Sequence, residues 1–111
     1  MSTRATIQYF DGCPGWTVAR DNLATAAREL GVTLDLTEQR VETVEDAERL
    51  DFVGSPTILL DGVDPFRLPK ARPALACRLY ATPAGPSPSP SVAQLVAAIE
   101  GARLAAGEPP H

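Results

Sequence analysis

Three segments with regularly spaced apolar residues follow one another at the start of the chain. They restrict the folds that the chain can form. Residues 5–10 alternate along the chain and are rich in β-branched and aromatic side chains, which predicts a strand. Apolar residues then recur at helical spacing from Trp16 to Leu30, and Gly31 supplies the helix stop. Residues 32–37 alternate again. A strand, a helix and a strand in this order form a βαβ unit, whose two strands are expected to be parallel.

Two further helices are expected in the rest of the chain. A short acidic helix is predicted over residues 44–50, with Thr43 as the N-cap and acidic residues at its positive end. A final helix is predicted over residues 92–104. Ser91 and Gln94 stand before it at the spacing of a capping box.

Two further strands are expected between these helices. Residues 57–60 form an apolar run that ends at Asp61-Gly62, the pair typical of a tight hairpin turn. The antiparallel partner is then predicted over residues 75–80. The intervening residues 63–73 and the later residues 82–91 are rich in proline, so both are predicted to be extended connectors without strand or helix.

The predicted order β-α-β-α-β-β-α belongs to the α/β class. It is expected to form a central mixed four-stranded sheet flanked by helices. The length of 111 residues, with 44% hydrophobic residues, suits a single domain. We expect this domain to span residues 1–104 and to be followed by a flexible tail over residues 105–111.

Composition excludes several classes of partner. The chain carries ten Lys and Arg residues against fourteen Asp and Glu residues, so its formal charge is -4 and no nucleic-acid partner is expected. No apolar run approaches the roughly 20 residues of a membrane helix, and residues 1–10 lack the apolar region of a signal peptide. The sequence therefore predicts a cytoplasmic protein with no membrane partner.

Two rare residue types restrict the chemistry further. The single histidine is His111, the last residue, so Ser-His-Asp catalysis, a Cys-His pair and a histidine-rich zinc site are not expected. The two cysteines, Cys13 and Cys77, are too few for a four-cysteine zinc site or a disulfide-dense secreted scaffold. We expect no cofactor. Any catalytic chemistry should use thiols, carboxylates, arginines or backbone dipoles.

Cys13 is the strongest candidate for a reactive group. It stands where the first predicted strand ends and the first predicted helix begins. The unpaired amides of Gly15 and Trp16 and the helix dipole favour an anion there, so the thiolate form of Cys13 should be stabilised. Pro14 is expected in the first helical turn, where it fixes the entry angle. The alternative is that Cys13 is only a small buried residue or a helix cap.

The chain resembles the thioredoxin-like superfamily. The resemblance lies in the motif Cys13-Pro14-Gly15-Trp16, in Gly54-Ser55-Pro56-Thr57 before the third strand, and in the order of elements over residues 5–104. It implies that Pro56 is cis and opposite the active-site cysteine. It also implies that Ser55 faces an extended thiol substrate and that Gly54 leaves backbone room. The alternative is an ordinary trans turn before a strand.

The motif departs from the family at the second cysteine position, which holds Trp16. A single thiol can begin thiol–disulfide exchange, but a resolving thiol must come from elsewhere. The expected partner is a small-molecule thiol or a protein disulfide. Cys77 is the one candidate for the resolving thiol. The alternative is that Cys77 packs in the sheet beside Leu75 and Leu79. Trp16 is either a stacking residue beside the thiol, and thus part of a substrate site, or a core residue.

A weaker resemblance is to the core of the organomercurial (alkylmercury) lyases. These enzymes also use two cysteines far apart in sequence, so the resemblance implies that Cys13 and Cys77 hold mercury or another soft metal. The family acid follows the first cysteine by three residues, where this chain has Trp16, so Asp11 is the substitute proton donor. The lyases also have an N-terminal region that has no counterpart here. A third hypothesis is a non-catalytic thioredoxin-fold binding module.

Overall fold

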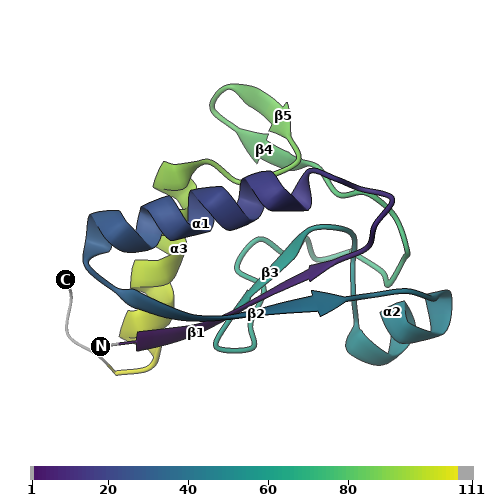
Figure 1. Ribbon diagram of the computed structural model, residues 1–111, viewed down its shortest axis with the longest axis horizontal. Helices are drawn as coiled ribbons and strands as arrows, with labels where there is room; N and C mark the ends of the chain where they lie inside the picture. Colours follow the sequence, from purple (N-terminus) through teal and green to yellow (C-terminus); the bar gives the residue numbers. More distant parts are fainter. Residues whose placement is uncertain (1, 108–111) are drawn as a thin grey trace.

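The protein is described here by a computed structural model that places residues 2–107 (Figure 1). In chain order the elements are β1 (Ser2–Tyr9), α1 (Trp16–Leu30), β2 (Thr33–Arg40), α2 (Val44–Leu50), β3 (Thr57–Leu60), β4 (Tyr80–Thr82), β5 (Gly85–Ser87) and α3 (Val92–Ala105). The α/β class and the three predicted helices are confirmed. The predicted tail begins in the last residue of α3, and residues 108–111, including His111, lie outside the described residues.

The strands β1, β2 and β3 form one mixed sheet in the order β2-β1-β3. β1 and β2 run parallel, with Ala5 opposite Leu36, as the βαβ unit predicted. β3 runs antiparallel to β1, with Ile7 opposite Ile58. α1 and α3 lie against each other beside this sheet, and α2 lies apart from them, past the end of β2 (Figure 1).

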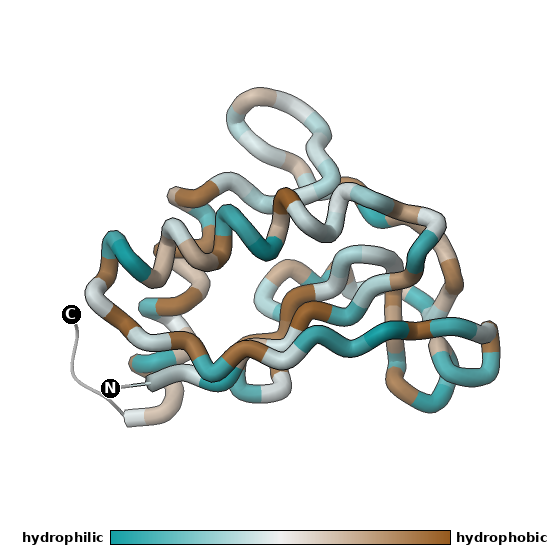
Figure 2. Tube along the Cα trace, viewed as in Figure 1, coloured by the Kyte–Doolittle hydropathy of each residue, from teal (hydrophilic) through white to brown (hydrophobic). Residues whose placement is uncertain are grey.

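The core lies between the sheet and the two long helices. β1 and β3 are largely buried, whereas β2 is an edge strand whose side chains are mostly exposed, and Figure 2 shows its later half as hydrophilic. One end of each helix is capped as the sequence predicts. Gly31 ends α1 in the left-handed conformation, Thr43 caps α2, and Ser91 and Gln94 form a complete capping box before α3.

The prediction of a fourth strand over residues 75–80 is wrong, and the main sheet has three strands rather than four. The turn at Asp61-Gly62 does form, since Leu60 and Val63 exchange both backbone hydrogen bonds. The chain then leaves the sheet edge because Pro65 follows and because the Asp64 carboxylate accepts a hydrogen bond from the amide of Phe66, which turns the chain away.

The predicted connector over residues 82–91 is also wrong in part, because it contributes to a second sheet. β4 and β5 form a two-stranded antiparallel hairpin in which Ala81 lies opposite Pro86. Both strands of such a hairpin are edge strands, and proline is tolerated at an edge because the amide that it lacks has no partner there. A proline-rich composition therefore did not exclude this short hairpin.

Gly101 is expected to weaken α3, since glycine inside a helix loses more backbone entropy on folding than alanine. A Cβ atom added at Gly101 meets no atom within 4 Å. We therefore expect Gly101→Ala to raise the free energy of unfolding by about 0.5–1 kcal/mol in urea denaturation. Gly15→Ala is the matched control. Its added Cβ would lie 2.5 Å from the Pro88 Cβ, so it should lower stability, and equal effects of the two changes would contradict the account.

Candidate functional site

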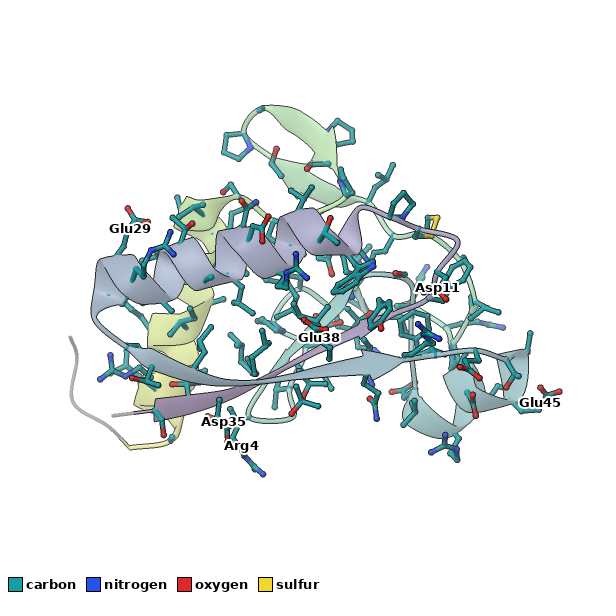
Figure 3. All side chains as sticks on the ribbon, viewed as in Figure 1. Arg4, Asp11, Glu29, Asp35, Glu38 and Glu45 are labelled. Carbon is teal, nitrogen blue, oxygen red and sulfur yellow. A yellow bond between two sulfur atoms is a disulfide. The ribbon has the colours of Figure 1, made fainter. Side chains whose placement is uncertain are left out.

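The two cysteines form a disulfide bond that joins distant parts of the chain. The Cα atoms of Cys13 and Cys77 lie 5.6 Å apart across a sequence separation of 64 residues. Figure 3 shows the bond in yellow, past the N-terminal end of α1. The sequence left open whether Cys77 lay within reach of Cys13, and the structure brings the two residues together.

Cys13 lies in the loop that connects β1 to α1. Its amide donates to the Phe10 carbonyl at 3.2 Å, which closes a tight turn directly after the strand. Gly15 is the N-cap of α1, so Cys13 lies two residues before the cap. The expectation that Pro14 belongs to the first helical turn is wrong: Pro14 precedes the cap, and its carbonyl accepts from the amide of Thr17. The helix dipole therefore acts on Cys13 from a greater distance than the sequence suggested.

Ser55 lies between the two cysteine segments and contacts both. The Ser55–Pro56 peptide bond is cis, as the resemblance implied. The Ser55 Oγ accepts a hydrogen bond from the amide of Phe10 at 3.2 Å, on the Cys13 side. On the Cys77 side, the Ser55 amide donates to the Ala76 carbonyl at 2.8 Å, and the Ser55 carbonyl accepts from the amide of Arg78 at 2.9 Å. The backbone of Ser55 is thus occupied by the chain's own segment 76–78.

The Arg78 side chain anchors the segment that carries Cys77. Its guanidinium donates to the Asp64 carboxylate at 2.7 Å, to the Phe66 carbonyl at 2.8 Å and to the Thr57 Oγ1 at 3.3 Å. Only 10% of the Arg78 side chain and 7% of the Asp64 side chain are exposed. Sequence reasoning does not find this pair, because Asp64 lies 14 residues away in an irregular loop and no periodic pattern links the two.

Tyr80 fixes the chain on the other side of Arg78. Its hydroxyl donates to the carbonyl of Pro56, and its ring lies 4.5 Å from the Arg78 guanidinium carbon. Burial raises the pKa of Tyr80 far above its usual range, although the nearby guanidinium opposes this shift. The phenol therefore stays protonated and remains a donor to Pro56.

Of the two roles that the sequence left open for Trp16, the structure shows packing against the core. The residue is half-buried and packs against the main core. Its ring also stacks on that of Tyr9 with centroids 4.1 Å apart and an interplanar angle of 17°. The Arg20 guanidinium carbon lies 5.2 Å from the Trp16 ring centroid. Trp16 thus fixes the start of α1 next to the disulfide loop and keeps part of its surface accessible.

Asp11 is exposed and lies two residues before Cys13 (Figure 3). Its carboxylate forms an ion pair with the Arg40 Nε at 3.6 Å. A hydrogen bond with Tyr9 and the negative charge of Asp11 both raise the pKa of Arg40. The Asp11 carboxylate therefore belongs to an exposed ion pair with Arg40, the last residue of β2.

The described residues contain no cluster of three or more side chains of the kind that ligate metals. When reduced, Cys13 and Cys77 would supply two thiolates, which suits two-coordinate binding of a soft ion only. None of the three helices over residues 2–107 has the length and apolarity that a bilayer crossing requires.

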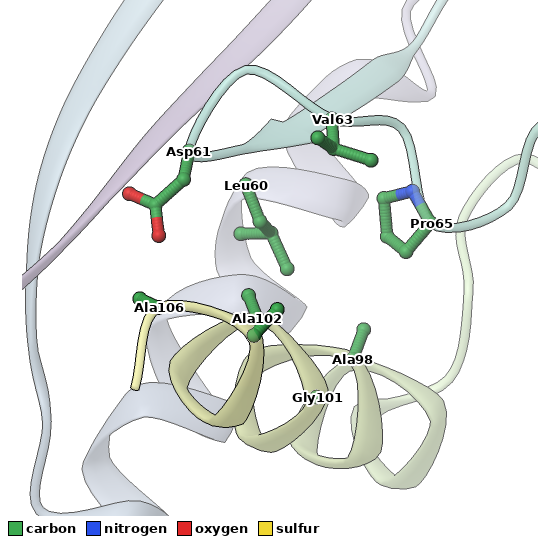
Figure 4. Close-up of a pocket in the computed structure, with 9 residues that line it drawn as sticks. Leu60, Asp61, Val63, Pro65, Ala98, Gly101, Ala102 and Ala106 are labelled. Atoms are coloured by element: carbon green, nitrogen blue, oxygen red, sulfur yellow. The ribbon is translucent and has the colours of Figure 1, made fainter. Parts of the chain in front are cut away.

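An apolar cavity of about 450 Å³ lies away from this site, between α3 and the loop that follows β3 (Figure 4). Small residues of α3, among them Ala98 and Ala102, form one wall, and Leu60, Val63 and Pro65 form the other. Asp61 is the one charged residue in the lining. The cavity lining contains none of the predicted site residues and no thiol or hydroxyl group.

Comparison of the chain with protein-family models, curated proteins and solved structures found no match.

Proposed function

We propose that this protein carries out thiol–disulfide exchange through Cys13 and Cys77 and that its architecture is thioredoxin-like. The observation that carries the proposal is the pairing of its two cysteines directly beside the cis Ser55–Pro56 bond. The parallel β1 and β2, the connecting α1 and the antiparallel β3 support the resemblance in architecture. The missing cysteine of the usual motif is replaced, in function, by Cys77.

The proposed reaction is a two-electron exchange. The reduced dithiol gives two electrons and two protons to a substrate disulfide, which leaves as two thiols, and the protein keeps the Cys13–Cys77 bond. The reverse reaction oxidises two substrate thiols. In a reducing cytoplasm the pair would rest as the dithiol, ready to reduce a disulfide.

The substrate of this reaction is a small-molecule thiol or a cysteine in an extended peptide. The resemblance implies that such a peptide pairs with the backbone of Ser55, and segment 76–78 of the chain itself makes those hydrogen bonds. An extended segment that carries a cysteine is thus compatible with this edge.

Binding of mercury or another soft metal by the reduced pair is the second candidate function. The same closeness of the two sulfur atoms supports it, because thiolates prefer soft ions. The finer proposal, cleavage of a carbon–mercury bond with Asp11 as proton donor, has less support. The Asp11 carboxylate pairs with Arg40 and is exposed to solvent, with 68% of its side chain accessible.

The test is a single-turnover reaction between the reduced protein and a short peptide with one disulfide. We expect each chain to reduce one peptide disulfide and to acquire the Cys13–Cys77 bond, measured by intact mass after acid quenching. The variant Cys13→Ser should stop at a mixed disulfide, because it has no second thiol to resolve it, and Cys77→Ser should not complete the reaction either.

A titration with Hg(II) distinguishes the second candidate function, metal binding, from thiol–disulfide exchange. Tight binding of one ion per chain that needs both cysteines, together with no reaction toward the peptide disulfide, would replace exchange by metal capture. No reaction in either assay would leave a binding module without thiol chemistry.

A further inference from the structure

The two cysteines of the disulfide differ in their exposure to solvent. Cys13 is buried, with 4% of the residue exposed, whereas Cys77 is exposed. Building on the proposed thiol–disulfide exchange, we propose that Cys77 is the residue that exchanges with external thiols. Cys13 is then the internal thiol that leaves Cys77 during reduction and attacks it again during oxidation. This order is the reverse of the one that the position of Cys13 before a helix suggested.

Access decides where an external thiol attacks. The attacking thiolate must reach a sulfur atom from the side opposite the bond that breaks, so a buried sulfur is a poor target. Cys13 lies in the turn that follows β1, where its own amide donates to the Phe10 carbonyl, and only 4% of the residue is exposed. Cys77 is an exposed residue. The folded protein therefore offers Cys77, rather than Cys13, to an external thiol.

The complete reduction then has two balanced steps. An external thiolate bonds to the Cys77 sulfur as the Cys13–Cys77 bond breaks and the electron pair passes to Cys13. A second external thiolate attacks its partner in the mixed disulfide, which releases a small-molecule disulfide and the Cys77 thiolate. Both protein thiolates take protons from water. Oxidation follows the same path backwards, so the mixed disulfide on Cys77 is its intermediate as well.

The structure also keeps Cys77 in place after the bond breaks. Its two neighbours are held independently of the disulfide, because Ala76 and Arg78 both bond to the Ser55 backbone and the Arg78 side chain is anchored on Asp64. Cys77 is thus held close to Cys13 in the mixed disulfide, which favours rapid attack by the Cys13 thiolate.

The test maps the first mixed disulfide with reduced glutathione as the probe. Oxidised wild-type protein is mixed with glutathione, quenched with acid at early times, and alkylated with N-ethylmaleimide in denaturant. Trypsin separates the cysteines, because residues 5–20 hold Cys13 and residues 71–78 hold Cys77. We expect glutathione on the peptide 71–78 in at least about tenfold excess over the peptide 5–20.

The matched control is the same reaction in guanidinium, where the fold no longer covers Cys13 and the two adducts should form in comparable amounts. A majority of adduct on Cys13 in the native protein, or the same ratio in both conditions, would overturn the proposed order while exchange itself stands. A native disulfide that glutathione does not reduce would overturn the proposed function together with the order.

Discussion

Reduction of the Cys13–Cys77 disulfide is expected to lower the free energy of unfolding by about 4 kcal/mol, because the bond closes a loop with a sequence separation of 64 residues. Closure of so long a loop removes much of the conformational freedom of the unfolded chain. The measurement is urea denaturation with and without tris(2-carboxyethyl)phosphine.

The matched control is the double variant with Cys13→Ser and Cys77→Ser. It should show the reduced stability at the start and should not respond to the reductant. A loss below about 1 kcal/mol on reduction of the wild type would contradict the prediction. It would mean that the unfolded chain is already restrained without the bond.

Arg78→Met is expected to lower the free energy of unfolding of the oxidised protein by about 3–5 kcal/mol, because it leaves the buried Asp64 carboxylate without its countercharge. The change also removes the donors to Phe66 and Thr57, so the loop after β3 loses its attachment to the Cys77 segment. The measurement is urea denaturation in the absence of reductant.

Arg67→Met is the matched control, because Arg67 also pairs with an aspartate, Asp51, but at the exposed surface. It should change stability by less than about 1 kcal/mol. Adding Asp64→Leu to Arg78→Met should recover part of the loss, since it removes the unpaired charge. If Arg78→Met and Arg67→Met have equal effects, the buried pair does not anchor this loop.

The three helices and the parallel strand pair could be predicted because their signals are local. Helical periodicity gives α1, and Gly31, Thr43 and the Ser91 capping box mark helix ends through contacts within one turn. The order of strand, helix and strand also determines the parallel pairing of β1 with β2. These signals need no knowledge of residues elsewhere in the chain.

The region after β3 could not be predicted because long-range contacts determine it. The pattern from Leu75 to Tyr80 is that of a strand, but the backbone of Ser55 and the Asp64 carboxylate hold this segment in an irregular course. A strand propensity there was overridden by tertiary contacts. The hairpin β4–β5 was missed for a different reason, since proline was taken to exclude any strand, including a short edge strand.

Sequence reasoning found the residues of the candidate site but assigned their environments only in part. Cys13, Ser55 and Pro56 were located through motifs, and the structure brings Cys77 to them. Exposure could not be predicted, because it depends on which segment lies over Cys13. The thiolate-stabilising position of Cys13 indicated a reactive sulfur, and its burial assigns the first contact with a substrate to Cys77 in our account.

The central claim, that Cys13 and Cys77 form a reversible redox pair, is tested most directly by equilibration in glutathione redox buffers. The populations of dithiol, mixed disulfide and intramolecular disulfide are measured by intact mass after acid quenching and alkylation. We predict one two-electron transition between the dithiol and the Cys13–Cys77 bond, reached from both directions, with little mixed disulfide at its midpoint. A protein that accumulates glutathione on both cysteines, or that stays reduced throughout, would contradict the account.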